Sequence, residues 1–249
     1  MSRGQSDAIG FVLVFSLIVL TVGTVYAAGY PALEAFRTSE QLENMERAFD
    51  VLDDNVDDIV REGAPSRATE IKLNGGTLAV RERSTVTITA VNEETGENFT
   101  VPAATRPITY TDGDTTVASS FGAVFRSDDG AAVMRDDPGW LVDDDRAVIP
   151  LVVTSRSGER GAIGGQSTVL VAMEATSRGV ADEMTAGDGH VVRVNVTVES
   201  PRVDAWKRYF ESLDMTPVDG DASDGEITYQ VEVDRVVVPQ TTVRVRLDR

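Results

Sequence analysis

The single histidine, His190, is the first residue to examine for chemistry, because imidazole serves both as a general base and as a metal ligand. It follows Gly187-Asp188-Gly189 at the expected start of a strand. The chain has no cysteine, so a zinc site of histidine and thiolate ligands is excluded. No serine motif places a nucleophile near His190. The sequence therefore predicts no catalytic site around this residue.

Two further stretches resemble ligand-binding loops only in part. Asp219, Asp221 and Ser223 resemble the opening of a calcium loop, but Asp224 occupies the glycine position and Gln230 the position of the bidentate glutamate. The glycine-rich run 161–166 lacks the lysine and the helix of a phosphate-binding loop. We expect no specific metal, no cofactor and no enzymatic activity; a loose cation site on clustered carboxylates stays open as an alternative.

Two sequons are candidates for glycan attachment. They are Asn98-Phe99-Thr100 and Asn195-Val196-Thr197, and they become acceptors only if the domain is exported. Asn195 lies within a strand pattern, so its side chain must point to solvent to qualify.

The charge of the chain limits its partners. The 249 residues carry 41 acids against 23 bases, a net charge of −18, and only two of the bases are lysine. A strongly negative surface repels phosphates, so nucleic acid is excluded as a partner. Abundant aspartate with scarce lysine resembles proteins of extreme halophiles, in which short carboxylates bind water and salt ions densely. We expect acid runs such as 136–137 and 143–145 on the solvated surface.

The part of the chain discussed so far follows a long apolar segment, which must position it. Residues 8–33 contain no charged side chain and as a helix would reach roughly 39 Å, more than a hydrocarbon core of about 30 Å. We expect a membrane-spanning helix. Arg3 precedes it and the acidic bulk follows it, which predicts a cytoplasmic N-terminus and an extracellular C-terminal domain at the cell membrane.

The residues before this helix carry a resemblance. Arg3-Gly4-Gln5-Ser6-Asp7, followed directly by the apolar run, resembles the class III signal peptide of archaeal type IV pilins, and the stretch 3–13 is similar to pilin-like surface proteins of haloarchaea. The resemblance implies that prepilin peptidase cuts between Gly4 and Gln5 and that the retained helix packs against other pilin subunits. Bacterial pilins carry a glutamate where this chain would have Ile9, so their subunit registration does not transfer.

Two alternatives for the N-terminus stay open. One is a plain signal anchor without processing at Gly4. The other is a secretory signal cut before Ala28, where Val25 and Ala27 have the expected spacing, although the apolar run before that site is longer than usual.

The helical pattern continues beyond the apolar run. Pro31 predicts a bend or break. An apolar stripe then follows at helical spacing, and 63–65 ends it. The stripe consists of Leu33, Phe36, Leu42, Met45, Phe49, Leu52, Val56 and Ile59, opposite a polar face of Glu43, Glu46, Arg47, Asp53, Asp54 and Asp57. The expected organisation is a signal peptide 1–4, a stem helix 5–63 bent near Pro31, and a β-rich head 66–249.

The head shows short alternating segments with turn residues between them, which is typical of an antiparallel sandwich or open barrel-like sheet. A hairpin is expected across Asn74-Gly75-Gly76. The expected strands are 71–73, 78–80, 84–91, 99–101, 108–110, 123–125, 147–154 interrupted at Pro150, 167–174, 190–199, 226–238 and 241–247.

One helical insertion interrupts the strands. Trp206, Tyr209 and Phe210 share a face with Leu213 after Ser200-Pro201, a segment that is also similar to the haloarchaeal pilin-like proteins. Either these aromatics contact a neighbouring subunit or a sugar, or the helix covers the open end of the sheet.

The sequence thus predicts an α+β chain: a long hydrophobic helix, then an antiparallel β-sandwich-like head with one short inserted helix. The resemblance implies a non-catalytic pilin-like filament subunit acting in assembly, surface adhesion or biofilm formation. The alternative is a monomeric, membrane-anchored surface or accessory (minor pilin) protein. A secreted enzyme or solute-binding domain lacks a supporting motif.

Overall fold

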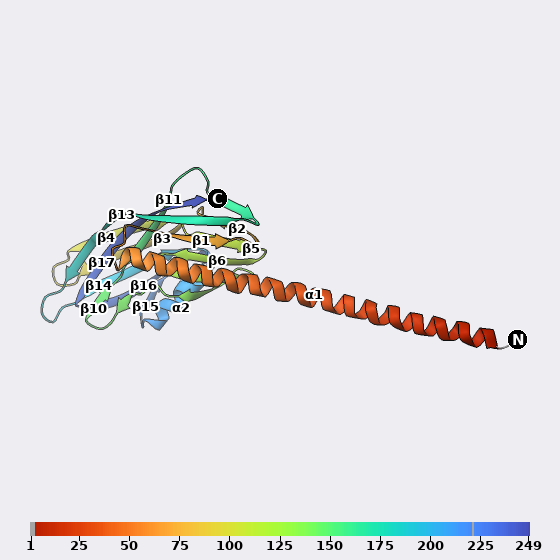
Figure 1. The fold of residues 1–249 in the computed structure, drawn as a ribbon. Coiled ribbons are helices and arrows are strands. Elements are labelled where there is room, and N and C mark those ends of the chain that lie inside the picture. The colour runs from red at the N-terminus through yellow and green to blue at the C-terminus, as the bar shows by residue number, and fades with distance from the viewer. Residues whose placement is uncertain (1–2, 221) are drawn as a thin grey trace. The chain divides into compact units, whose positions relative to one another are not determined.

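The computed structural model describes residues 3–220 and 222–249, without the side chains of 3–7, 31, 32, 34, 35 and 222. The chain divides between Asn44 and Met45 into two compact units. A single helix, α1 (Arg3–Val60), belongs to both, and the β-rich head follows it (Figure 1). The expected α+β class is confirmed.

The first unit consists of helix α1 up to Asn44. The helix continues through Pro31, so the chain does not break there. Within the apolar run, Thr21 donates its hydroxyl to the Leu17 carbonyl at 2.7 Å and Thr24 donates to Leu20 at 2.8 Å. These bonds satisfy both hydroxyls within the helix itself, so they are tolerated in an apolar environment.

The second unit opens with the last turns of α1, which are packed into the head. The apolar stripe is confirmed where it enters this unit: Met45, Phe49, Leu52, Val56 and Ile59 are all buried. Polar contacts tie the same turns to strands of the head. Asn55 donates to the Thr69 hydroxyl at 2.9 Å, and Glu46 accepts from Arg126 at 2.8 Å.

Three mostly antiparallel sheets make up the head. The first contains β1 (Ser66–Lys72), β13 (Thr168–Thr185), β17 (Arg235–Asp248), β10 (Arg146–Val148) and β9 (Leu141–Val142), with β11 (Leu151–Arg156) also on β17. The second runs β12 (Ala162–Gly165), β2 (Gly75–Ala79), β5 (Ile108–Asp112), β6 (Thr115–Ser120), β7 (Ala123–Asp128) and β8 (Ala131–Asp136). The third runs β15 (Thr216–Asp219), β16 (Glu226–Val233), β14 (Val192–Glu199), β3 (Ser84–Asn92) and β4 (Asn98–Thr105).

The hairpin expected across residues 74–76 is wrong. Strand β1 pairs with β13, whereas β2 pairs with β5 and β12. The two strands therefore belong to different sheets, and Gly75, at φ +136°, serves a crossing between sheets instead of a two-residue turn.

The strands near the C-terminus also differ from their expected bounds. β16 ends at Val233 and β17 runs unbroken from Arg235 through Pro239 to Asp248. A bulge in β13 between Val180 and Asp182 lies where Pro239 is paired, which fits a residue that has no N–H to donate.

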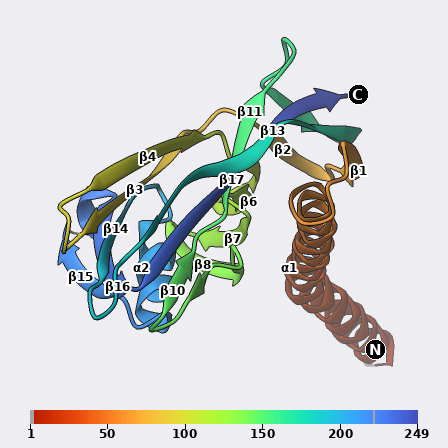
Figure 2. The same cartoon turned by 90° about the vertical axis from the view of Figure 1, so that its left-hand side faces the viewer.

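Strand β13 is much longer than the expected 167–174 segment. It lies beside β17 over its length (Figure 2). β1 covers its other edge only as far as Glu174, and among the described strands none pairs with that edge from Thr176 to Thr185. A second bulge lies between Ala175 and Ser177.

Helix α2 (Val203–Ser212) confirms the expected insertion. It packs on an apolar core of the head, to which residues from all three sheets contribute. The carbonyl end of the helix is tied by Ser212, whose hydroxyl donates to the Tyr209 carbonyl at 2.7 Å.

A substitution at Gly76 tests how closely β2 packs against β5 just after the crossing from β1. A Cβ at this position would lie 2.5 Å from Tyr110 Cζ and 2.6 Å from the Thr111 backbone oxygen. We expect Gly76→Ala to lower the free energy of unfolding by about 1–3 kcal/mol, since the β2–β5 pairing must shift. Denaturant unfolding measures this. Gly179→Ala is the matched control, because no atom lies within 4 Å of its Cβ position; equal effects of the two variants would contradict the prediction.

Candidate functional site

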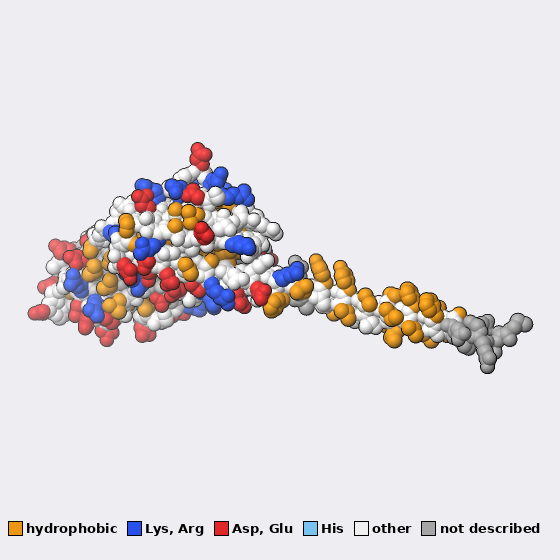
Figure 3. Space-filling model, in the orientation of Figure 1, with side chains coloured by type: hydrophobic (Ala, Val, Ile, Leu, Met, Phe, Trp, Pro, Cys, Tyr) orange, Lys and Arg blue, Asp and Glu red, His pale blue; other side chains and the backbone are white. Residues whose placement is uncertain are grey.

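The most exposed apolar surface lies on the first unit. Residues Ala8–Tyr30 form a 23-residue helical segment that is exposed throughout and is long and apolar enough to cross a membrane (Figure 3). Phe11 is 72% exposed and Leu20 67%. Such a continuous apolar surface is not stable in water and has to be covered by lipid or by other apolar helices. The segment could therefore anchor the chain in a membrane.

The expected processing site precedes this segment. Arg3, Gly4 and Gln5 belong to α1 by their backbone, but their side chains lie outside the described part of the structure. Their role in cleavage stays a prediction.

The two sequons differ in access. Asn98 is exposed at the start of β4. Asn195 lies on the central strand β14 between β3 and β16, on the face opposite the buried Val194 and Val196. Its side chain is only half exposed, and its Oδ1 is buried without a described hydrogen-bond partner. Asn98 is therefore the more accessible acceptor.

The aromatic face of α2 is used inside the head. Trp206 is 1% exposed, Phe210 0% and Tyr209 9%. The Trp206 ring lies 5.4 Å from the Trp140 ring, and the Trp140 backbone N–H donates to the Tyr209 hydroxyl at 3.2 Å. Of the two alternatives, the structure favours the covering helix, because these rings are not available to a neighbour or a sugar.

Trp140 was missed by sequence reasoning. It stands in an irregular segment after Pro138-Gly139, where no periodicity marks a buried residue. Its indole Nε1 donates to the Pro150 carbonyl at 3.1 Å, and Pro150 lies in the break between β10 and β11. A tryptophan in an otherwise acidic loop is the signal that could have identified it.

The residues examined for metal or catalytic chemistry lie apart. His190 is exposed, with Nε2 3.7 Å from a Glu94 carboxylate oxygen. Asp219 and Ser223 are exposed, and Asp221 lies outside the described residues. Residues 162–165 of the glycine-rich run form strand β12. Within the described ranges, no three histidine or carboxylate side chains are grouped so that they could hold a metal ion.

Asp53 is the most unusual titratable group of the head. Sequence periodicity placed it on the polar face of the helix, but its exposed fraction is only 7%. The placement was wrong because Asp53 is four residues after Phe49 and flanks the apolar stripe, at a position that the head covers. Its Oδ1 is buried without a hydrogen-bond partner in the described chain.

The surroundings of Asp53 disfavour its charge. Burial is the largest effect, and together with the carboxylates of Asp136, Asp57 and Asp54 it raises the pKa of Asp53 to about 8, against a smaller opposing effect of Arg61. Asp53 is therefore largely protonated at neutral pH. Burial likewise raises the pKa of Asp57. The junction between α1 and the rest of the head thus depends on protonation.

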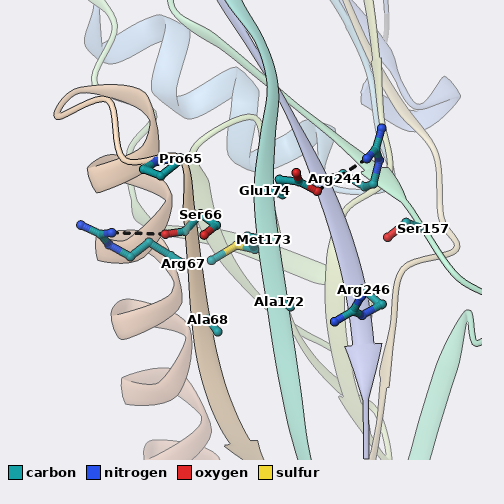
Figure 4. Close-up of a pocket in the computed structure, with 10 residues that line it drawn as sticks. All are labelled: Pro65, Ser66, Arg67, Ala68, Ser157, Ala172, Met173, Glu174, Arg244 and Arg246. Atoms are coloured by element: carbon teal, nitrogen blue, oxygen red, sulfur yellow. Dashed lines mark hydrogen bonds and ion pairs between the residues drawn. The ribbon is translucent and has the colours of Figure 1, made fainter.

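A groove of about 590 Å³ lies on the outer side of β1, β13 and β17 (Figure 4). Its arginines are each held by a carboxylate: Arg67 Nε is 2.7 Å from Asp58, Arg244 Nη1 3.5 Å from Glu174, and Arg246 Nε 2.7 Å from Asp248. These pairs occupy the charged groups that would otherwise meet a ligand.

Comparison with known proteins yields one match. A family model described as a family of unknown function (DUF7289) matches residues 3–246. Neither the curated proteins nor the solved structures contain a match to the chain.

Proposed function

Because the chain belongs to this family of unknown function, whose description assigns no activity, we propose from its own features that it is a non-catalytic, type IV pilin-like subunit of a cell-surface filament. The helix supplies assembly, and the β-rich head supplies surface contact or adhesion.

One observation carries the proposal. Helix α1 combines an apolar segment, Ala8–Tyr30, that is exposed on every side with a final stretch, Met45–Val60, whose apolar stripe is buried against the head. The C-terminal part of such a helix is packed against the head, and the apolar segment is available to bind other molecules. The same surface suits lipid before assembly and copies of itself afterwards, since helices in both settings meet through apolar side-chain packing.

The charge distribution supports the orientation that the proposal needs. Among the residues that precede the apolar segment Arg3 is basic, and the acidic head follows the segment. Short basic flanks stay on the cytoplasmic side of a membrane. The head, including the candidate glycan acceptor Asn98, would then be extracellular.

Processing at Gly4 tests this function. The intact mass of protein from cells is expected to correspond to a chain starting at Gln5, and Gly4→Val is expected to abolish this cleavage, because a side chain at that position hinders the close approach of the peptidase. Gly10→Val is the control; a Cβ at Gly10 meets no atom within 4 Å, and the variant should be processed normally.

Other starts would contradict the proposal in different ways. A chain that begins at Met1 or Ser2 would indicate a plain anchor, and one that begins at Ala28 a secreted domain. Correct processing together with retention in the membrane after cells are sheared would favour the alternative, a membrane-anchored accessory protein that does not form the bulk filament.

A further inference from the structure

Five arginines lie together at one end of the head, which we call the arginine end. They come from three separate connections: Arg81 and Arg83 between β2 and β3, Arg106 between β4 and β5, and Arg156 and Arg160 at and after the end of β11. All five are exposed, and none forms an ion pair with a described carboxylate. Ten other arginines of the head do form such pairs, namely Arg61, Arg67, Arg126, Arg135, Arg146, Arg193, Arg202, Arg235, Arg244 and Arg246.

Backbone contacts bring these side chains together. The Val80 N–H donates to the Gly161 carbonyl at 2.9 Å, and Arg106 Nη1 donates to the Arg81 carbonyl at 3.1 Å. The side chains of Arg156 and Arg81 both lie against Gly161, where an added Cβ would meet them. Two glutamates lie among these arginines: Glu82 is paired with the buried Arg202 at 3.0 Å, and Glu159, between Arg156 and Arg160, forms no ion pair with a described arginine. Five positive charges thus outnumber the carboxylates placed among them, at a cost in repulsion.

The opposite end of the head, the acidic end, carries the reverse charge. Hydrogen bonds join its connections. Asn92 Nδ2 donates to the Thr185 carbonyl at 3.4 Å, the Ala186 N–H to the Asp234 backbone carbonyl at 2.8 Å, and the Asp234 N–H to the Asp145 backbone carbonyl at 3.0 Å. Three basic residues of this end, Arg146, Arg193 and Arg235, already pair locally. Its acids are Glu93, Glu94, Glu97, Asp143, Asp144, Asp145, Asp182, Glu183, Asp188, Glu232 and Asp234.

Strand β17 joins the two ends. Its first residue, Arg235, pairs with Arg146 and Thr185 at the acidic end, and Val245 pairs with Arg156 at the arginine end. At about 3.3 Å per residue the ends are roughly 33 Å apart. Red side chains gather at the end near β10, whereas several blue ones lie below the tip of the loop beyond β11, which is itself red (Figure 3, with the strands in Figure 1).

We propose that the arginine end of one head binds the acidic end of a second copy of this chain. Guanidinium groups that have no carboxylate partner match carboxylates in fork geometry, and the carboxylates of the acidic end, such as Asp144 and Asp188, outnumber its arginines. For a chain of net charge −18, an approach through unlike ends is the one that avoids repulsion. The contact joins two different surfaces, so it repeats head to tail instead of closing a dimer. It rests on the proposed function only in that a filament brings many copies together.

Cross-linking of the full chain in detergent tests the contact. The chain has no cysteine, so Glu159→Cys and Thr95→Cys place one thiol at each end without removing an arginine. With a flexible bismaleimide, the double variant is expected to give a ladder of oligomers, whereas each single variant gives monomer. Dimers from the single variants, which would mean contact between like ends, or no ladder at all, would overturn the proposal.

Charge reversal supplies the second arm. Arg156→Glu with Arg160→Glu is expected to reduce the ladder at least tenfold, and adding Asp144→Arg with Asp188→Arg in the same chain should restore it. Lys207→Glu with Arg37→Glu changes the net charge equally at two exposed positions outside both ends and should keep the ladder. A ladder that survives reversal of both arginines would refute the contact. Filaments that still form from the chain with both arginines reversed would refute the contact but not the proposed filament function. A normal ladder from a chain that is never processed at Gly4 would support the contact and contradict the filament function.

Discussion

Trp206→Ala is expected to lower the free energy of unfolding of the head by about 3–5 kcal/mol, the range for truncating a fully buried tryptophan. Trp206 is 1% exposed, and its ring is within 6.5 Å of five other aromatic rings: those of Phe121, Phe125, Trp140, Tyr209 and Phe210. Removing the indole leaves a cavity between α2 and the sheets, which the surrounding strands cannot close because each is fixed by its pairing. Denaturant unfolding of the detergent-solubilised chain, followed by the remaining tryptophan, measures the loss.

Two companion variants sharpen this result. Tyr209→Phe keeps the ring and removes only the acceptor for the Trp140 N–H, so a loss of about 1–2 kcal/mol is expected. Val133→Ala on β8, where the side chain is 45% exposed, should cost well under 1 kcal/mol. If Trp206→Ala were no worse than Val133→Ala, the aromatic cluster would not be the core of the head.

Asp53→Asn is expected to stabilise the head at neutral pH by roughly 2–4 kcal/mol, because it removes the need to bury a carboxyl group among carboxylates. The pKa of Asp53 is about 8 in the folded chain and 3.8 in an ordinary carboxyl. Between these values the folded state binds the proton that the unfolded state has lost. Stability of the natural chain therefore falls as pH rises from about 4 to 8, by up to about 1.4 kcal/mol per pH unit from this group.

The pH profile distinguishes this explanation from a general effect of lowering the negative charge. The gain from Asp53→Asn should shrink as pH falls and vanish near pH 4, where the aspartate is protonated in both states. Asp144→Asn removes a carboxylate from an exposed position that does not act on Asp53, and it should change stability by less than about 0.5 kcal/mol. A gain that is independent of pH, or equal in the two variants, would contradict the assignment.

The strongly periodic elements could be predicted from sequence. The apolar run, the stripe from Met45 to Ile59, strand β3 and helix α2 each repeat a pattern over enough residues that local preference and burial agree. The pairing of strands could not be predicted. Asn74-Gly75-Gly76 has the composition of a hairpin turn, yet which strand lies beside β1 is decided by β13, almost a hundred residues later.

The candidate sites were predictable to a lesser degree. The apolar segment is evident from composition, because none of its residues carries a charge and most are apolar. Asp53 was not, since helical spacing alone puts it at the border of the stripe and only the covering head makes it buried. The arginine end was not either: Arg81, Arg106 and Arg156 are dispersed in sequence and are brought together by connections from different sheets.

The irregular edge of β13 affects whether copies of the head can pair with one another strand to strand. Bulges at Ala175/Ser177 and Val180/Asp182 disturb the even alternation of N–H and C=O groups where no other described strand covers them. An incoming strand finds donors and acceptors out of step and cannot zip along the backbone. In the proposed filament, this edge would keep neighbouring heads from pairing strand to strand in amyloid-like stacks, and contacts between heads would depend on their side-chain charges.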